Sequence, residues 1–274
     1  MRALDRRRLA PLGILVAGLA AAVWLGLDPR DLFTARAVSS IGAFLRAALR
    51  PTLIAEDGGH SLAPELFAAL RTTAAFALAG ISLSVGIGAV FGFFASSAWW
   101  EEEGAGGLRR SVGPAVTGVT RVVIAAMRSV HELLWAMLFL AAMGLAPATA
   151  VVAIAIPYGG TLAKVWSEML DEAPREAARS LRAIGAGSGP AYLVGLLPRV
   201  LPDMASYGFY RLECALRSSA VLGFLGFPTL GYHVALTFRN LHYRETWTFL
   251  YALFALVAAV ELWSAALRRR GGWA

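Results

Sequence analysis

The chain has 274 residues, of which 58% are hydrophobic and only 16% charged, and its mean hydropathy is +0.61. Soluble domains carry about 25% charged residues, so this composition excludes an ordinary water-soluble protein. The net charge is +7, and every basic residue except Lys164 is an arginine. Because the arginines gather at the ends of apolar runs, as cytoplasmic membrane anchors do, we do not expect nucleic acid as a partner.

The first predicted element is a membrane span over residues 9–27, which follows Arg6, Arg7 and Arg8. This apolar run is long for a signal peptide and no clear small-residue cleavage site follows it, so we expect the span to be retained. Residues 28–64 carry apolar side chains at roughly helical spacing with arginines between them. That pattern predicts an amphipathic helix lying on the membrane surface.

Further apolar segments are long enough to cross a bilayer, and they lie at 65–95, 113–144, 147–169, 200–222 and 246–267. The segment 113–144 is interrupted by Arg128, His131 and Glu132, which leaves open one bent helix or a broken one. Together with the first span, the sequence predicts an all-α, multi-pass membrane protein of about six spans in one domain, 1–274. An even number of spans and arginine-rich ends place both termini in the cytoplasm.

A charged patch at 171–190 stands between two of these spans. Pro174 suits a first helical turn, and Asp171 and Glu172 lie where a helix dipole favours acids. The following residues favour helix, and glycines from Gly185 onward end it. We therefore expect a short amphipathic helix, a turn, and re-entry into the membrane at Leu197 and Pro198. A docking element and a merely solvated loop both fit this pattern.

Ionisable residues inside the apolar segments suggest a solute pathway, because charges are costly within a bilayer. Arg128 and Glu132 are four residues apart, as are Glu213 and Arg217, so each pair is expected to share a helix face and to pair. One interpretation is that Arg217, with Ser218 and Ser219, guides an anion through a pore. The alternative is that both pairs are intrahelical salt bridges that fix helix packing.

The sequence carries no pattern for chemistry of its own. A P-loop requires a lysine after glycine and before serine or threonine, whereas Lys164 follows Ala163 and precedes Val165. The single cysteine, Cys214, can form neither an intrachain disulfide nor a cysteine metal site. We expect no catalytic residue, no metal site and no cofactor in this chain.

The charged patch resembles the signature loop of bacterial ABC importer permeases, which has Glu-Ala-Ala, a glycine, nine residues, an apolar residue, any residue and Leu-Pro. Here Gly185 is followed by residues 186–194 and then by Gly195, Leu196, Leu197 and Pro198. Gly195 stands where the family has isoleucine, and Glu176-Ala177-Ala178 lies one turn before the family's register, which here holds Arg179. Other segments are similar to phosphonate-type permeases, namely Arg128–Ala136 with Gly144 and Leu145, Leu197–Pro202, Tyr210–Glu213 and Arg217–Gly223.

This resemblance covers roughly residues 110–265 and implies a type I ABC importer permease fold, with a core bundle over 65–267 and a cytoplasmic coupling loop over 171–198. It implies that Glu176, Ala177, Ala178, Arg179, Gly185, Leu197 and Pro198 couple the chain to an ATPase. The implied partners are ABC ATP-binding subunits that hold ATP and magnesium, a periplasmic solute-binding protein, and a second permease copy or paralogue. The chain would then import phosphonate or a related small oxyanion across the bacterial inner membrane. The run Phe227–Gly231 is less glycine-rich than in that family.

Other functions remain open at this point. The solute could be a different small molecule, or the chain could be half of a heterodimer. A secondary transporter or channel could use Arg128, Glu132 and Arg217 without an ATPase, although it would not need a docking helix. A membrane enzyme could use His131 and Glu132 as acid and base, but no nucleophile or metal site accompanies them.

Overall fold

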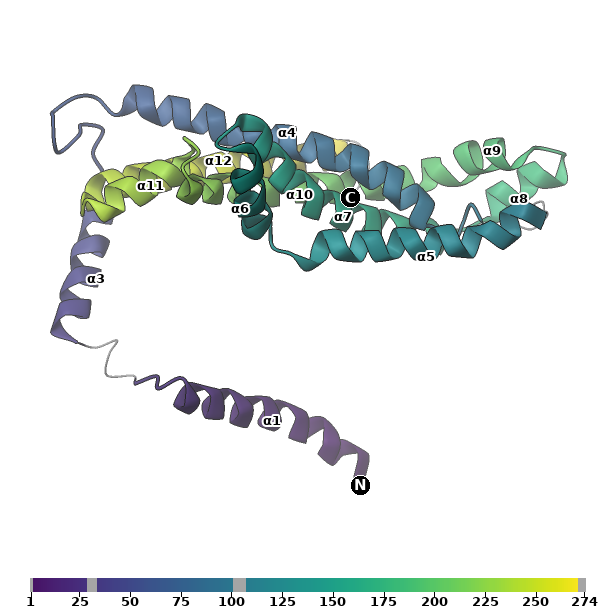
Figure 1. Cartoon of the computed structure of the whole chain (residues 1–274), viewed down its shortest axis with the longest axis horizontal. Helices are drawn as coiled ribbons and strands as arrows, with labels where there is room; N and C mark the ends of the chain where they lie inside the picture. The colour runs from purple at the N-terminus through teal and green to yellow at the C-terminus, as the bar shows by residue number, and fades with distance from the viewer. Residues whose placement is uncertain (1, 29–33, 101–106, 271–274) are drawn as a thin grey trace. The chain divides into compact units, whose positions relative to one another are not determined.

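A computed structural model describes residues 2–28, 34–100 and 107–270, which fall into two compact units, residues 1–50 and 51–274 (Figure 1). The prediction of one domain over the whole chain stays a prediction. The helical elements, in chain order, are α1 (Arg2–Trp24), α3 (Ala35–Ala48), α4 (Ala63–Ala95), α5 (Gly107–Ser129), α6 (Glu132–Met143), α7 (Pro147–Glu172), α8 (Glu176–Ala183), α9 (Ser188–Pro190), the π-helical turn η1 (Ala191–Leu196), α10 (Leu197–Val221), the 3-10 turn η2 (Leu222–Leu225), α11 (Leu230–Arg239) and α12 (Tyr243–Arg270).

The first unit contains α1 and α3. Thr34 caps α3, because its Oγ1 accepts a hydrogen bond from the backbone N–H of Ala37 at 3.3 Å. The exposed side chains of Val38, Ile41 and Leu45 recur at helical spacing, so the predicted amphipathic helix is confirmed. Its location on a membrane surface stays a prediction. Within α1, Pro11–Trp24 is an apolar helical segment, and the retained first span over residues 9–27 stays a prediction.

The second unit contains the other predicted spans. Within the described residues, α4, α7 and α12 are each long and apolar enough to cross a membrane. Two further pairs of helices change direction at a short break, namely α5 with α6, and Ser188–Leu225 with α11. If each pair counts as one span, the possible number of spans is five. The predicted spans at 65–95, 147–169 and 246–267 are therefore confirmed as long apolar helices.

Helices α4 and α7 pack closely along their length because glycines stand at their contact. A Cβ atom at Gly80 would lie 2.8 Å from the Cγ2 atom of Ile154, and one at Gly88 would lie 2.7 Å from the Cβ atom of Leu162. Both distances are too short for a side chain, so only glycine permits this approach. The buried core is built mainly on this pair, with α10 packed against both.

The segment predicted at 113–144 is broken rather than bent. Helix α5 ends at Ser129, α6 begins at Glu132, and the two axes differ by 88°. His131 caps α6, because its Nδ1 accepts a hydrogen bond from the backbone N–H of Leu133 at 3.3 Å. Arg128 and Glu132 therefore lie on different helices, so the prediction that they share a helix face was wrong.

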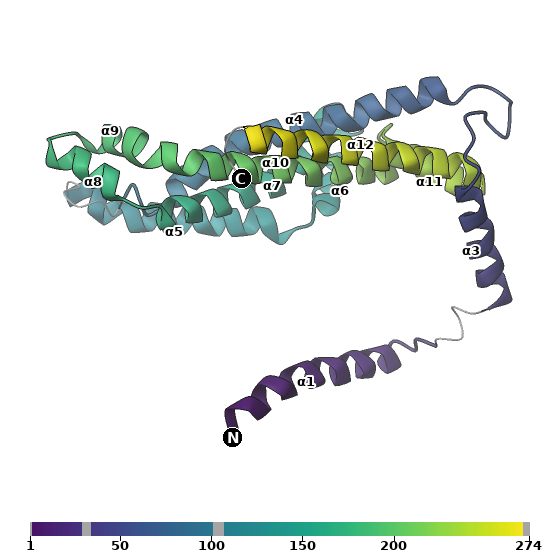
Figure 2. The same cartoon turned by 180° about the vertical axis from the view of Figure 1, so that it is seen from behind.

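The two ends of the 51–274 unit are built differently. Helices α8 and α9 lie at one end of the bundle, whereas α11 and the start of α4 lie at the opposite end (Figures 1 and 2). The end with α8 and α9 therefore holds the charged patch that the sequence singled out.

Candidate functional site

The charged patch folds as the sequence predicts, into a short helix, a turn and a return into the bundle. After α7 the backbone at Ala173 is extended, and α8 follows over Glu176–Ala183. Gly185 has φ +95°, and its N–H donates to the Arg182 carbonyl at 2.8 Å, while Ala186 N–H donates to the Leu181 carbonyl at 3.0 Å. A left-handed residue closes the helix in this way, which explains the glycine. The π-helical turn η1 then leads into α10.

One side of α8 packs against the chain's own return segment. Ala178 is buried against η1, and a Cβ atom at Gly195 would lie 2.8 Å from the Cα atom of Ala178. Glycine at position 195, where the resembling family has isoleucine, is therefore what allows the two segments to touch. Arg199 Nη1 also lies 3.5 Å from Glu176 Oε2, and Arg182 donates to Ser188 Oγ at 2.8 Å.

The other side of α8 faces outward. Arg179 is exposed, and Ile184 at the end of the helix has 81% of its surface exposed. Among the other predicted coupling residues, Glu176 and Pro198 are exposed, Ala177 and Leu197 are half-buried, and Ala178 is buried. The predicted coupling residues thus divide into exposed positions and positions packed against the bundle, and their role in coupling stays a prediction.

Asp171, in the last turn of α7, connects the coupling loop to two other helices. Its Oδ1 accepts hydrogen bonds from Ser96 Oγ at 2.7 Å, Ser97 N–H at 2.7 Å and Ala98 N–H at 3.1 Å, just after α4 ends. Its Oδ2 lies 3.1 Å from Nη2 of Arg121 on α5. Arg121 Nε also donates to the Ala95 carbonyl at 3.1 Å. One carboxylate therefore ties α4, α5 and α7 together at the base of the loop.

The sequence pattern predicted Asp171 only as an acid favoured near a helix start. The structure instead puts it at a helix end, where its lone pairs satisfy N–H groups beyond α4. No local pattern in the sequence indicates these contacts, since the donors lie more than seventy positions earlier in the chain.

A second polar group joins three helices deeper in the bundle. Ser218 on α10 donates to Glu132 Oε1 on α6 at 2.8 Å, and its Oγ lies 2.8 Å from the hydroxyl of Tyr158 on α7. Glu132 Oε2 lies 3.5 Å from His131 Nε2. The predicted pathway residues Glu132 and Ser218 are thus in contact, and Tyr158, which the sequence analysis missed, extends their network.

The remaining predicted pathway residues are held differently. Glu213 is buried, and its Oε1 lies 3.7 Å from Nη1 of Arg268 on α12, so its described ion pair is with Arg268 and not with Arg217. Arg217 is exposed on α10. Ser219 is fully buried, and its hydroxyl bonds to the carbonyls of Thr73 at 2.9 Å and Leu216 at 2.8 Å. The contacts of Glu213 and Ser219 are those of packing residues, and their place in a pathway stays a prediction.

Arg128 lines a separate cavity between α5 and α7, with a volume of about 300 Å³. Arg121, Lys164 and Glu168 also line it, and Lys164 pairs with Glu168 along α7. This cavity therefore has a basic wall, and Arg128 belongs to it and not to the network around Glu132.

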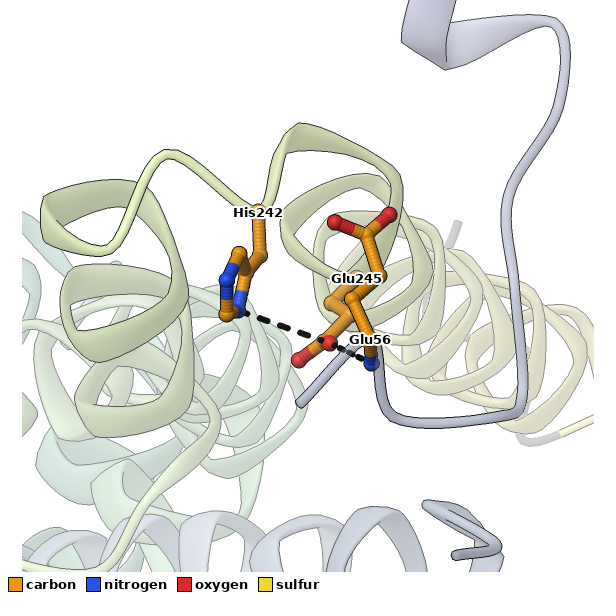
Figure 3. Close-up of side chains that lie close together, drawn as sticks. All are labelled: Glu56, His242 and Glu245. Carbon is orange, nitrogen blue, oxygen red and sulfur yellow. Dashed lines mark hydrogen bonds and ion pairs between the residues drawn. The ribbon is translucent and has the colours of Figure 1, made fainter. Parts of the chain in front are cut away.

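A cluster of ionisable groups lies at the opposite end of the 51–274 unit, where the sequence analysis assigned no role to His242. One ligand-type atom from each of Glu56, His242 and Glu245 lies within 4.8 Å of the other two (Figure 3). Glu56 N–H donates to Glu245 Oε1 at 2.6 Å. His242 Nδ1 lies 3.6 Å from Glu245, and its Nε2 lies 3.4 Å from Asp57. His242 therefore lies between the carboxylate of Asp57 in the loop before α4 and that of Glu245 on α12.

Most of the chain is similar to known proteins of one family. Residues 103–270 match the family described as "Binding-protein-dependent transport system inner membrane component". A phosphite transport system permease protein of Stutzerimonas stutzeri, PtxC, is 31% identical over 79% of this chain and 77% of its own length. The phosphate-import permease protein PhnE of Mycolicibacterium smegmatis is 27% identical over 94% of this chain, which spans 45% of that relative.

Solved structures support the fold. An amino acid ABC transporter matches with a TM-score of 0.62 and 15% identity, over 76% of this chain and 94% of that chain. The MetNI methionine ABC transporter in an inward-facing conformation matches with a TM-score of 0.62 and 18% identity, over 76% and 97% respectively. These similarities give the all-helical, type I ABC importer permease fold. The chain belongs to the family of binding-protein-dependent transport system inner membrane components.

Proposed function

We propose that this chain forms the membrane pathway of an ATP-driven importer whose cargo is a phosphonate or a related phosphorus oxyanion. The observation that carries the proposal is α8, which is anchored on one side by Gly195 and Arg199 and is open on the other at Arg179 and Ile184. A helix held in this way has a surface prepared for a partner. The relatives named for phosphite and phosphate support the class of cargo.

In this function the partner on α8 is an ATP-binding subunit, and two permease copies or paralogues enclose the pathway. ATP binding draws the ATPase subunits together and moves the docked α8 helices. Asp171 carries that movement to α4 and α5, because it holds both at the start of the coupling loop. ATP and magnesium belong to the partner subunit, and this chain contributes no catalytic group.

The same proposal assigns an orientation. The coupling loop and both termini lie in the cytoplasm of a bacterium, and the chain is a multi-pass protein of the inner membrane. A periplasmic solute-binding protein delivers the anion at the opposite end, near α11. The anion then passes the polar groups of the bundle, among which Glu132, Ser218 and the exposed Arg217 lie on different helices or faces.

The test is a purification in mild detergent of the intact chain and of two glycine variants, with mass spectrometry of the proteins that accompany each. Gly185→Asp places a side chain at φ +95°, which strains the end of α8. Gly189→Asp is the matched control, because a Cβ atom there has no heavy atom within 4 Å. We expect a P-loop ATPase with the intact chain and the control, and its loss with Gly185→Asp.

The absence of an ATPase from all three folded samples would contradict the proposal. Uptake of the solute by the purified chain alone in liposomes would then favour a secondary transporter.

A further inference from the structure

We propose that Arg211 on α10 is the cation that meets the oxyanion inside the permease. This proposal rests on the proposed function, since it takes the cargo to be a phosphorus oxyanion. In this proposal Arg211 determines the specificity of the pathway. Arg211, and not Arg217, has a guanidinium that its neighbours orient for binding an anion.

The charge of Arg211 is energetically costly at its position unless the guanidinium contacts a partner or a water-filled cavity. It lies on α10 about 21 Å along the helix axis from Leu197, so it is near the middle of a helix about 37 Å long. A cation at such a depth is retained in membrane proteins when it faces a water-filled cavity or a partner. Among the described residues no ion pair to a carboxylate is found for Arg211, whereas Arg121, Arg199 and Arg268 each have one.

Tyrosines hold the Arg211 guanidinium in place. Its Nε donates to the Tyr207 hydroxyl at 2.9 Å, and its Nη2 donates to the same oxygen. Its Cζ lies 5.1 Å from the ring centre of Tyr207, 5.7 Å from that of Tyr210 and 5.9 Å from that of Tyr158. These rings attract the cation without neutralising it. The group is therefore fixed in direction, and N–H donors are left over for an anion, because a guanidinium has five.

The face of α10 that carries Arg211 is polar. At 100° per residue, Tyr207, Tyr210, Cys214, Arg217 and Ser218 fall with Arg211 within about 120° of the helix circumference. Tyr210 is 50% exposed and Arg217 is exposed, so this face is not covered by the rest of the described chain. Tyr158 also joins it to the network of Ser218 and Glu132, which supplies further hydroxyl donors beside the cation.

A guanidinium whose orientation is fixed by its neighbours binds a tetrahedral oxyanion better than a mobile guanidinium does. Arginine binds phosphate-type groups through two parallel N–H donors, and little entropy is lost when the fork is already oriented. The exposed Arg217 has no described contact that would orient it. The rings also keep the binding moderate, which transport requires, because a tightly held anion would not leave.

The experiment compares uptake by the full transporter, with its ATPase and binding protein, in proteoliposomes containing intact chain, Arg211→Gln, Arg211→Lys or Arg217→Gln. Phosphite, phosphate and methylphosphonate are the cargo probes, and ATP hydrolysis stimulated by loaded binding protein is measured in parallel. We expect Arg211→Gln to lower uptake about tenfold, the size expected when a charged hydrogen bond is lost. Stimulated ATP hydrolysis persists, Arg211→Lys restores part of the uptake, and Arg217→Gln costs less than Arg211→Gln.

Two results would overturn the proposal, and they are distinguishable. If the intact transporter moves an oxyanion and Arg211→Gln moves it equally well, or Arg217→Gln is the more damaging change, the assignment to Arg211 fails alone. If the intact transporter moves none of the probes, the proposed function fails with it. Should Arg211→Gln not assemble, Tyr207→Phe removes only the orienting hydroxyl and is expected to lower uptake about threefold.

Discussion

At the coupling loop Asp171 and Glu176 contact arginines, whereas Arg211, near the middle of α10, contacts tyrosine rings and a tyrosine hydroxyl. Asp171 holds three N–H or O–H donors and Arg121, and Glu176 holds Arg199. Arg211 lies among tyrosines instead, and Ser218 shares its hydroxyl between Glu132 and Tyr158. The first arrangement fixes backbone segments to one another. The second orients the Arg211 guanidinium and leaves some of its N–H donors unused, as the proposed anion pathway requires.

The largest effect that would sharpen this comparison is expected from Gly195→Ile, which introduces the residue usual in resembling permeases. A Cβ atom at this position would lie 2.8 Å from Ala178 Cα and 2.9 Å from its nitrogen, so α8 must move. The nearest atoms belong to the backbone and cannot rotate aside, so we expect a larger effect than that of an ordinary overpacked side chain. The amount of co-purified ATPase should fall about tenfold. Gly189→Ile is the control, since that position is open. Equal ATPase recovery from both variants would mean that α8 is not held by this contact.

A smaller effect is expected from Asp171→Ala, which leaves the donors of Ser96, Ser97 and Ala98 without their acceptor. Each unmade bond to a charged acceptor costs about 1.5–3 kcal/mol at most, and the carboxylate is partly exposed, so a total of a few kcal/mol is expected. Solute moved per ATP hydrolysed should fall about threefold to tenfold in proteoliposomes, because α4 and α5 no longer follow the loop.

Glu172→Ala is the matched control for Asp171→Ala, since Glu172 is its exposed neighbour. A variant that loses ATP hydrolysis and transport in equal proportion would argue that Asp171 serves stability alone.

The sequence predicted correctly those structures that depend on neighbouring residues in the chain. Helix propensity and the glycines near 185 predict a helix, a turn and a return, and the structure has them, whereas Pro174 lies before the Arg175 N-cap and not in the predicted first turn. The spacing of four residues predicted the ion pairs inside the bundle wrongly, because it assumes a continuous helix and takes no account of partners on other helices. The break before Glu132 separates it from Arg128, and Glu213 pairs with Arg268, more than fifty positions away. Such partners depend on how helices pack, which no local pattern records.

The smallest effect is expected at the far end of the bundle, from His242→Leu. Its ring nitrogens lie 3.4 Å from the exposed carboxylate of Asp57 and 3.6 Å from the buried carboxylate of Glu245, which keeps its hydrogen bond from Glu56 N–H in the variant. Losing the two histidine contacts should lower the melting temperature by about 1–3 °C, measured by thermal unfolding in detergent, with uptake little changed. A large rise in melting temperature with added Zn²⁺, lost in the variant, would instead mean that the cluster binds metal.

The central claim is that an ATPase docks on the outward side of α8, and site-directed cross-linking tests it most directly. Cys214 is the only cysteine, so Cys214→Ser leaves a background in which Ile184→Cys labels the exposed end of α8 and Leu236→Cys labels α11 at the opposite end. With a thiol-linked photo-cross-linker in membranes, the account predicts a P-loop ATPase adduct from position 184 and none from position 236. An ATPase adduct from position 236 alone, or none from position 184 in a transporting sample, would contradict it.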